Sequence, residues 1–203
     1  MGQFKVPSGS HLVSAQPEEL RQYLLDLFCD VAYQEGDFTL SSGQRSSYYI
    51  NGKQVTLHAL GGLMVGRAIQ SFLPEDTKAV AGLTLGADPM VTAASVVAAY
   101  EGRAIAALIV RKEAKGHGTQ AYIEGPRLPE GSSVVVLEDV VTTGQSAMKA
   151  VNRLRDAGYH VNRIVALVDR QQGGAEFYAA QGLDFQALFT VQDLQAHWAE
   201  LHR

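Results

Sequence analysis

Hydrophobic residues recur at three- and four-residue spacing in the first third of the chain, which is typical of amphipathic helices. The first such pattern runs from Pro17 to about Glu35 and predicts a helix that begins at a proline. The segment 37–51 is polar, rich in β-prone residues and interrupted by a Ser-Gly turn, so we expect two short strands there. A second helical period follows, carried by Leu57, Leu60, Met64 and Ala68.

The centre of the chain alternates short apolar runs with helical patterns. The apolar runs are 79–83, 104–110, 134–137 and 163–168. Helices are expected from Asp88, as N-cap with Pro89 at the first helical position, and over 145–157, where Gly158 stops the helix. Runs that are buried on both faces suit parallel strands. The pattern therefore predicts an α/β fold with a mostly parallel twisted sheet flanked by helices.

The first residues of the chain are expected to be a tail without regular structure, whereas the last residues are expected to form a strand and a helix. Residues 1–16 show no apolar period and are interpreted as a loose tail, while 17–203 are expected to form a single domain. The last segment reads as a strand over 185–190 and a helix to about Leu201. We expect it to join the N-terminal pieces as a small hood over the sheet.

Composition narrows the class of protein. A chain of 203 residues with 46% hydrophobic and 19% charged residues fits a compact globular protein. A net charge of −4 argues against a nucleic-acid-binding surface, and no apolar stretch resembles a membrane span or a signal peptide. We therefore expect a cytoplasmic protein without nucleic-acid or membrane partners. The single cysteine, Cys29, lies four residues after Leu25 in the helical pattern and is interpreted as a packing residue.

The segment 134–147 carries the strongest chemical signal. A buried strand leads into Glu138 and Asp139, then into a Thr-Thr-Gly turn, then into a helix. Ligands of open α/β sheets bind at the carboxyl ends of strands, and the first turn of a helix offers free N–H groups to an anion. Residues 142–146 are therefore expected to hold a phosphate, with the two acids placed for sugar hydroxyls. An isolated match would more often be a polar strand end and a helix cap, but here the whole order is present.

A second segment, 111–125, follows the apolar run 104–110 and has no apolar period of its own. It contains three cations and a histidine close together, next to two glycines. By itself such a loop is usually a solvated surface, but beside a phosphate site it can supply charges to a leaving pyrophosphate. The glycines at 116 and 118 also fit a dinucleotide-binding pattern, which fails because no helical pattern follows them.

The residues of 134–147 resemble the phosphoribosyl-pyrophosphate-binding motif of the type I phosphoribosyltransferases. Four other segments are similar to the orotate phosphoribosyltransferases of that family: 38–51 (substrate segment), 82–89 (pyrophosphate loop), 111–118 (catalytic loop) and 167–174, which ends a strand with Arg170. The resemblance covers most of the chain from about residue 18 to 190. It implies the type I phosphoribosyltransferase fold and transfer of ribose 5-phosphate from phosphoribosyl pyrophosphate to orotate. The products would be orotidine 5′-monophosphate and pyrophosphate, in pyrimidine (UMP) biosynthesis.

The resemblance also assigns roles to individual residues. It implies catalytic roles for Lys115, His117 and Asp139. Orotate would contact Thr142 and Arg170 and the backbone near Tyr49 and Ile50. Phosphoribosyl pyrophosphate would be bound by Arg111, Lys112, Lys115, His117, Glu138, Asp139, Val140, Val141, Thr142, Thr143, Gly144, Gln145 and Ser146.

Cofactor and assembly are implied in the same way. Mg²⁺ would be held mainly through the pyrophosphate and ribose of the substrate, with no protein ligand of its own. The family is homodimeric, with the catalytic loop of one subunit closing over the site of the other.

The sequence also departs from the family. Many members carry a lysine where this chain has Ser41, and some carry one where Gly86 stands. Two rival functions remain. A nucleic-acid-binding regulator with this fold should show a basic face or an added DNA-reading domain, and we expect neither in this acidic chain. An enzyme for a purine base is opposed only by the segment 38–51 and Arg170.

Overall fold

The computed structural model describes residues 7–39, 43, 45–114 and 122–203. Its centre is a sheet with strand order β5-β4-β3-β6-β7-β8, in which β5 alone runs antiparallel to its neighbour. The strands are β3 (Ala79–Leu83), β4 (Ala106–Val110), β5 (Ile123–Glu124), β6 (Ser133–Val141), β7 (His160–Asp169) and β8 (Asp184–Thr190). The predicted mostly parallel, helix-flanked sheet is therefore confirmed.

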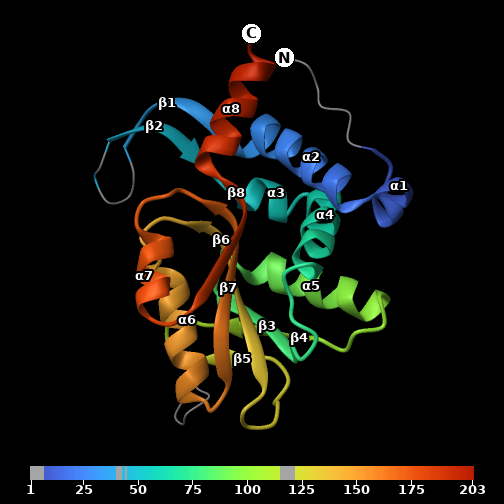
Figure 1. The fold of residues 1–203 in the computed structure, drawn as a ribbon, viewed down its shortest axis with the longest axis vertical. Helices are drawn as coiled ribbons and strands as arrows, with labels where there is room; N and C mark the ends of the chain where they lie inside the picture. Colours follow the sequence, from blue (N-terminus) through green and yellow to red (C-terminus); the bar gives the residue numbers. More distant parts are fainter. Residues whose placement is uncertain (1–6, 40–42, 44, 115–121) are drawn as a thin grey trace.

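Helices cover both faces of this sheet (Figure 1). One face packs against the N-terminal helices and α5, and the other against the two later helices α6 and α7. The helices on the faces are α4 (Ala59–Gln70), α5 (Asp88–Tyr100), α6 (Gln145–Asp156) and α7 (Gly174–Ala180). Side chains alternate between the two clusters along β6, where Val135 and Leu137 belong to one and Val134 and Val136 to the other.

A hood lies over one end of the sheet (Figure 1). Its antiparallel pair of strands, β1 and β2, is joined by the N-terminal helices and by the C-terminal helix, which lies beside α2. The elements are α1 (Gly9–Ser14), α2 (Pro17–Leu27), the π-helix η1 (Phe28–Ala32), β1 (Tyr33–Thr39), β2 (Arg45–Ile50), α3 (Lys53–Thr56) and α8 (Val191–Leu201). The prediction of a hood built from both ends of the chain is confirmed for α8 but is wrong for β8, which pairs with β7 in the main sheet.

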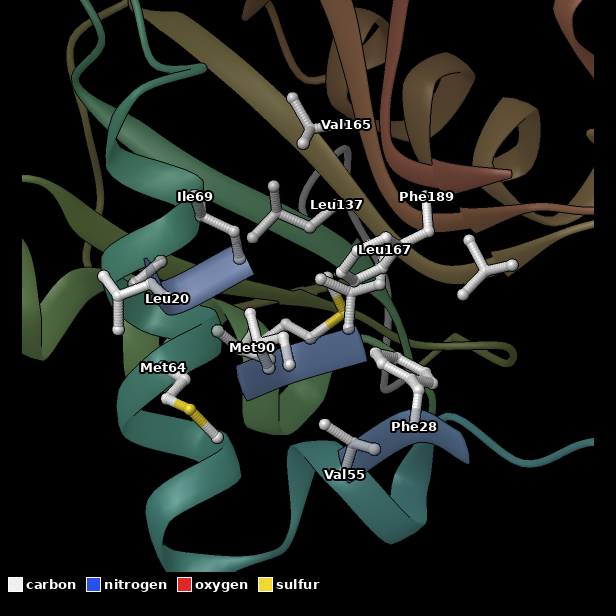
Figure 2. Close-up of a cluster of buried hydrophobic side chains, with 14 of the residues drawn as sticks. Leu20, Phe28, Val55, Met64, Ile69, Met90, Leu137, Val165, Leu167 and Phe189 are labelled. Carbon is white, nitrogen blue, oxygen red and sulfur yellow. The ribbon is translucent and has the colours of Figure 1, made fainter. Parts of the chain in front are cut away.

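The hood and the sheet share one hydrophobic core. Figure 2 shows Phe28 and Leu20 from the hood pointing toward the same interior as Leu137 and Leu167 from the sheet. Cys29 belongs to this core, with 1% of its surface exposed, and burial raises the pKa of its thiol to about 12. The interpretation of Cys29 as a packing residue is therefore confirmed.

Residues 7–16 do not form the loose tail that was expected. Residues 9–14 form α1, and Leu12 is fully buried. The guanidinium of Arg67 donates hydrogen bonds to the carbonyl oxygens of Leu12 and Ala15 at 2.5 and 3.0 Å. A contact from a residue so distant in sequence orders the segment, and no local periodicity could report it. Residues 1–6 lie outside the described ranges.

Two helix boundaries also differ from the prediction. The first helix ends as an α-helix at Leu27, continues as η1 and gives way to β1 at Tyr33, so Glu35 lies in a strand. Ala87 rather than Asp88 is the N-cap of α5, and the Asp88 carboxylate accepts a hydrogen bond from the Thr84 hydroxyl at 2.7 Å. In the described part of the chain, no helix is long and apolar enough to cross a membrane.

Candidate active site

The turn between β6 and α6 has the geometry of an anion site. Gly144 adopts the left-handed conformation with φ of 84° and is the N-cap of α6. A Cβ at this position would lie 2.8 Å from ring atoms of Tyr178, so both the backbone angle and the packing require glycine. The first N–H groups of α6 have no partner within the helix and carry its positive dipole end. This geometry is compatible with the predicted phosphate site, which stays a prediction; the turn, residues 142–146, is called the phosphate turn below.

The two acids lie within β6 rather than after it. Glu138 pairs with Ala166 in the ladder with β7, and pairing continues to Val141 and Asp169. The apolar run in the sequence ends at Leu137, but the backbone keeps its partner strand for four more residues. Glu138 is 8% exposed and Asp139 9%. Both carboxyl groups are therefore held by the sheet itself.

Glu138 faces the underside of the phosphate turn. Its side chain and that of Tyr178 line a cavity of about 80 Å³ together with Val140, Val141 and the turn residues 142–146. Among the residues that the structure describes, neither Glu138 Oε2 nor the Tyr178 hydroxyl has a hydrogen-bond partner, although both atoms are buried. Burial, reinforced by the charge of Asp139, raises the pKa of Glu138 to about 8, while Lys112 acts in the opposite direction.

Asp139 occupies a space between two glycines. A Cβ on Gly86 would lie 2.6 Å from Asp139 Oδ1, and one on Gly52 would lie 3.1 Å from its Cβ. The backbone N–H of Val140 donates to Oδ1 at 3.0 Å. Gly52 precedes α3 and Gly86 follows β3, so the hood and the sheet each leave room for this carboxylate.

Arg170 joins the sheet to the hood. Its backbone N–H donates to the carbonyl of Val141 at 2.9 Å, directly before the phosphate turn. Its Nε donates to the Tyr48 hydroxyl at 3.2 Å, and its Cζ lies 4.9 Å from the centre of the Tyr48 ring. Tyr48 in turn stacks on Tyr33 with 6.0 Å between ring centres. The guanidinium is thus oriented by β2, which also carries Tyr49, 43% exposed, and Ile50, half-buried.

The cations at the end of β4 approach the same region. Arg111 forms an ion pair with Glu124 at 3.1 Å, and its backbone N–H donates to the carbonyl of Tyr122 at 2.8 Å. Lys112 lines an opening of about 420 Å³ together with Ser146 of the phosphate turn. The other two predicted loop residues, Lys115 and His117, lie outside the described residues, as does Ser41.

Four residues of this arrangement were not singled out as ligand contacts from the sequence. Tyr178 had no signal, because an aromatic residue in a helix is usually core, and Tyr48 was covered only as a member of the segment 38–51. Gly52 and Gly86 contact Asp139 across long sequence distances, which a local pattern cannot report. Gly86, seen in the sequence as the absence of a lysine, is here the residue that leaves space for Asp139.

The site thus lies at the carboxyl ends of the parallel strands. It contains the phosphate turn, two buried acids, the guanidinium of Arg170 bonded to Tyr48, and the cations Arg111 and Lys112. Such a set suits a phosphorylated sugar whose hydroxyls meet the acids. Among the residues that the structure describes, no three His, Cys, Asp or Glu side chains group as a metal site. The carboxylates fit Mg²⁺ only as neighbours of a substrate that supplies phosphate oxygens.

Comparison with known proteins gives a consistent result. The family model for uracil phosphoribosyltransferase matches residues 73–183. The orotate phosphoribosyltransferase of Nostoc sp. is 71% identical over 93% of this chain and 91% of its own, and that of Synechocystis sp. is 65% identical over 91% and 93%. A crystal structure of Mycobacterium tuberculosis orotate phosphoribosyltransferase in complex with phosphoribosyl pyrophosphate superposes with a TM-score of 0.73 at 35% identity, covering 87% of this chain and 99% of that one.

The alignments with these relatives cover 87–93% of the chain, and the mostly parallel sheet is consistent with the type I phosphoribosyltransferase fold. The chain belongs to the orotate phosphoribosyltransferase family.

Proposed function

We propose that the cluster at the carboxyl edge of the sheet is the site where ribose 5-phosphate passes from phosphoribosyl pyrophosphate to orotate. The observation that carries this proposal is the placement of Arg170 directly beside the phosphate turn, with its backbone bonded to Val141. An acceptor base held there lies next to a sugar phosphate anchored on residues 142–146. The family membership supplies the reaction, and the geometry supports a role for each part.

The phosphate turn and the acids hold the donor. The N–H groups at the start of α6, with the hydroxyls of Thr142, Thr143 and Ser146, bind the 5′-phosphate. Glu138 and Asp139 accept hydrogen bonds from the ribose hydroxyls. Their burial supports this role, because a ligand hydroxyl would provide Glu138 with the partner that its Oε2 lacks in the described residues.

Arg111 and Lys112 stabilise the charge that grows on the pyrophosphate as its bond to ribose C1 breaks. Lys115 and His117 are assigned the same task by the resemblance alone. Mg²⁺ would be bound through pyrophosphate and ribose oxygens and would supply further charge neutralisation. Pyrophosphate leaves with the electron pair of the broken C1–O bond, and the ribose then carries positive charge at C1. A ring nitrogen of orotate forms the new bond there and loses its proton to solvent.

Arg170 recognises the carboxylate of orotate. A guanidinium presents two parallel N–H groups, which match a planar carboxylate. The Tyr48 hydroxyl accepts from Nε and leaves the terminal nitrogens to donate elsewhere. Thr142 and the backbone at Tyr49 and Ile50 complete the contacts with the base. This arrangement favours orotate over a purine, which has no carboxylate.

The enzyme acts as a homodimer with a shared site. An apolar groove of about 770 Å³ lies beside the turn that contains Gly86, and Leu57, Leu85 and Val96 are 70%, 71% and 61% exposed there. A second copy that covers this groove would lie next to the active site. The cytoplasmic location stays a prediction from the sequence.

The reaction is tested with the purified protein, phosphoribosyl pyrophosphate and Mg²⁺. Loss of orotate absorbance is expected with orotate, and no transfer with uracil, adenine or hypoxanthine. The variant D139N should lower kcat/KM and stay folded. The loss of transition-state stabilisation should be about 2 kcal/mol or more, as expected for loss of a charged hydrogen-bond partner. D76N is the matched control, because Asp76 is exposed and lies just before the amino end of β3, whereas the site lies at the carboxyl ends of the strands. Normal kinetics of D139N would refute the ribose assignment.

The shared site is tested by mixing two inactive variants, K115A and D139A, under mild denaturation. Random exchange makes half of the dimers mixed, and each has one site with both residues intact, so about a quarter of wild-type activity should return. Sedimentation measures whether the protein is a monomer or a dimer. The wild type should be a dimer, and V96D, which places a charge in the apolar groove, should be a monomer. Mixed dimers, confirmed by mass spectrometry, that show no recovered activity would refute the shared site.

A further inference from the structure

Arg153 of α6 bonds to the main chain where β4 ends. Its guanidinium donates one hydrogen bond to the carbonyl of Arg111 and a second to the carbonyl of Lys112 at 2.9 Å. The two acceptors are consecutive in the chain, so two nitrogens of one rigid group hold adjacent peptide units. Arg111 and Lys112 are the residues that the proposed function places at the pyrophosphate.

The same guanidinium also contacts the segment that leads into β5. Its Cζ lies 4.0 Å from the centre of the Tyr122 ring, a cation–π distance. The carbonyl of Tyr122 accepts from the N–H of Arg111 at 2.8 Å, which extends the antiparallel pairing of β4 and β5 by one step. Arg153 therefore contacts both chain segments at the end of this pair of strands.

Arg153 lies on the helix whose first turn is the phosphate site. Ser146 and Arg153 are seven residues apart, which is about 10 Å along a helix axis. Lys112, Ser146 and Arg153 line one opening, together with Leu83 and Lys149. One rigid helix therefore connects the expected position of the 5′-phosphate with the main chain that carries Lys112.

We propose that Arg153 is a positioning residue that fixes the main chain at Arg111 and Lys112 at a set distance from the phosphate turn. The inference rests on the proposed function, since it concerns how the two ends of phosphoribosyl pyrophosphate are bound together. Arginine suits the task because its planar fork reaches two carbonyl groups while one face stacks on an aromatic ring. A lysine ammonium is a point donor and cannot do both.

The alternative is that Arg153 contacts the pyrophosphate directly through its charge. The two roles differ in what a lysine at this position preserves. Lysine retains the positive charge but loses the forked contact with the main chain. R153K is therefore expected to behave like R153Q if Arg153 acts by positioning, and like the wild type if charge alone matters.

The matched control is on the same helix. Arg155 also donates from its guanidinium to a backbone carbonyl, that of Val161, at 3.2 and 2.7 Å. R155Q removes a contact of the same kind away from the opening that Lys112 lines. Any loss that merely follows from weakening α6 should be seen in both R153Q and R155Q.

Steady-state kinetics and calorimetry test the proposal. R153Q and R153K should each raise the KM for phosphoribosyl pyrophosphate and the inhibition constant of inorganic pyrophosphate by about tenfold, the effect of losing charged hydrogen bonds. R153Q and R155Q should lower the Tm by similar amounts, because each loses the hydrogen bonds of a guanidinium to backbone carbonyl oxygens. The orotate dissociation constant of the Arg153 variants and the kinetic constants of R155Q should stay at wild-type values. Y122F, which keeps the ring, should be normal, whereas Y122L should raise the same two constants in part.

Each contrary outcome has a distinct meaning. Normal constants for R153Q, or normal constants for R153K beside impaired R153Q, would overturn the positioning role while leaving the reaction intact. An equal rise of the same two constants in R155Q would also overturn it. If the wild-type protein transfers no ribose phosphate to orotate, the proposed function and this inference both fail.

Discussion

A methyl group at Gly86 should displace the carboxylate of Asp139. In G86A the ideal Cβ lies 2.6 Å from Asp139 Oδ1, about 0.8 Å inside the 3.4 Å at which ordinary contact begins. Cγ lies only 3.0 Å away, so rotation of the carboxylate alone does not relieve the overlap. The side chain must move toward Gly52, and the 3.0 Å hydrogen bond from the N–H of Val140 lengthens or breaks.

The substitution is expected to lower both catalytic efficiency and stability. A hydrogen bond to a charged group contributes about 1.5–3 kcal/mol of binding free energy. If the carboxylate of Asp139 is displaced, its hydrogen bond from a ribose hydroxyl should lose a large part of this contribution. We expect kcat/KM for phosphoribosyl pyrophosphate to fall about tenfold, which corresponds to a loss of about 1.4 kcal/mol of transition-state stabilisation. The free energy of unfolding should also fall, by about 1–3 kcal/mol, because the new methyl group crowds Asp139 and the Val140 N–H loses its charged partner.

Steady-state kinetics at saturating orotate, paired with urea unfolding, measure both quantities. G9A is the matched control, because its new Cβ would meet Leu60 at an ordinary 3.5 Å and lies in α1, far from the acids in sequence. It should leave kcat/KM unchanged. If G86A has the kinetics of G9A, the carboxylate of Asp139 does not need the position seen here, and the argument from the two glycines is refuted.

Three further outcomes follow from the described contacts. Because burial raises the pKa of Glu138 from 4.5 to about 8, the folded protein binds this proton more tightly, so its free energy of unfolding should fall as pH rises from about 4.5 to 8. E138Q should remove that fall in urea titrations at several pH values, and an unchanged pH dependence would contradict it. Y178F should match or exceed wild-type stability, because the lost hydroxyl is buried without a partner among the described residues, whereas Y178A should lower the free energy of unfolding by about 3–5 kcal/mol. A clear loss of stability in Y178F would show that the hydroxyl forms a hydrogen bond. R170K and Y48F should both weaken orotate binding in calorimetry, R170K more strongly, and wild-type affinity in Y48F would mean that the hydroxyl does not orient Arg170.

Local patterns were sufficient where the physical cause was local. The turn at 142–146 could be predicted because Gly144 permits a left-handed backbone and the residues after it begin a helix. The strand 79–83 was predicted with its observed bounds because a fully buried strand needs apolar residues on both faces. The orotate-binding role of Arg170 came from the family resemblance alone and stays a prediction.

Tertiary structure decided what depends on partners far away in the chain. β6 extends through Glu138 and Asp139 because β7 continues beside it, so the apolar run understated the strand. Residues 7–16 are ordered by Arg67, a partner that no periodicity of their own reveals. The space around Asp139, the contact of Tyr48 with Arg170 and the contacts of Arg153 all join elements whose proximity is set by packing. Sequence periodicity records which face of an element is buried, whereas the identity of the neighbour on that face exists only once the elements have packed together.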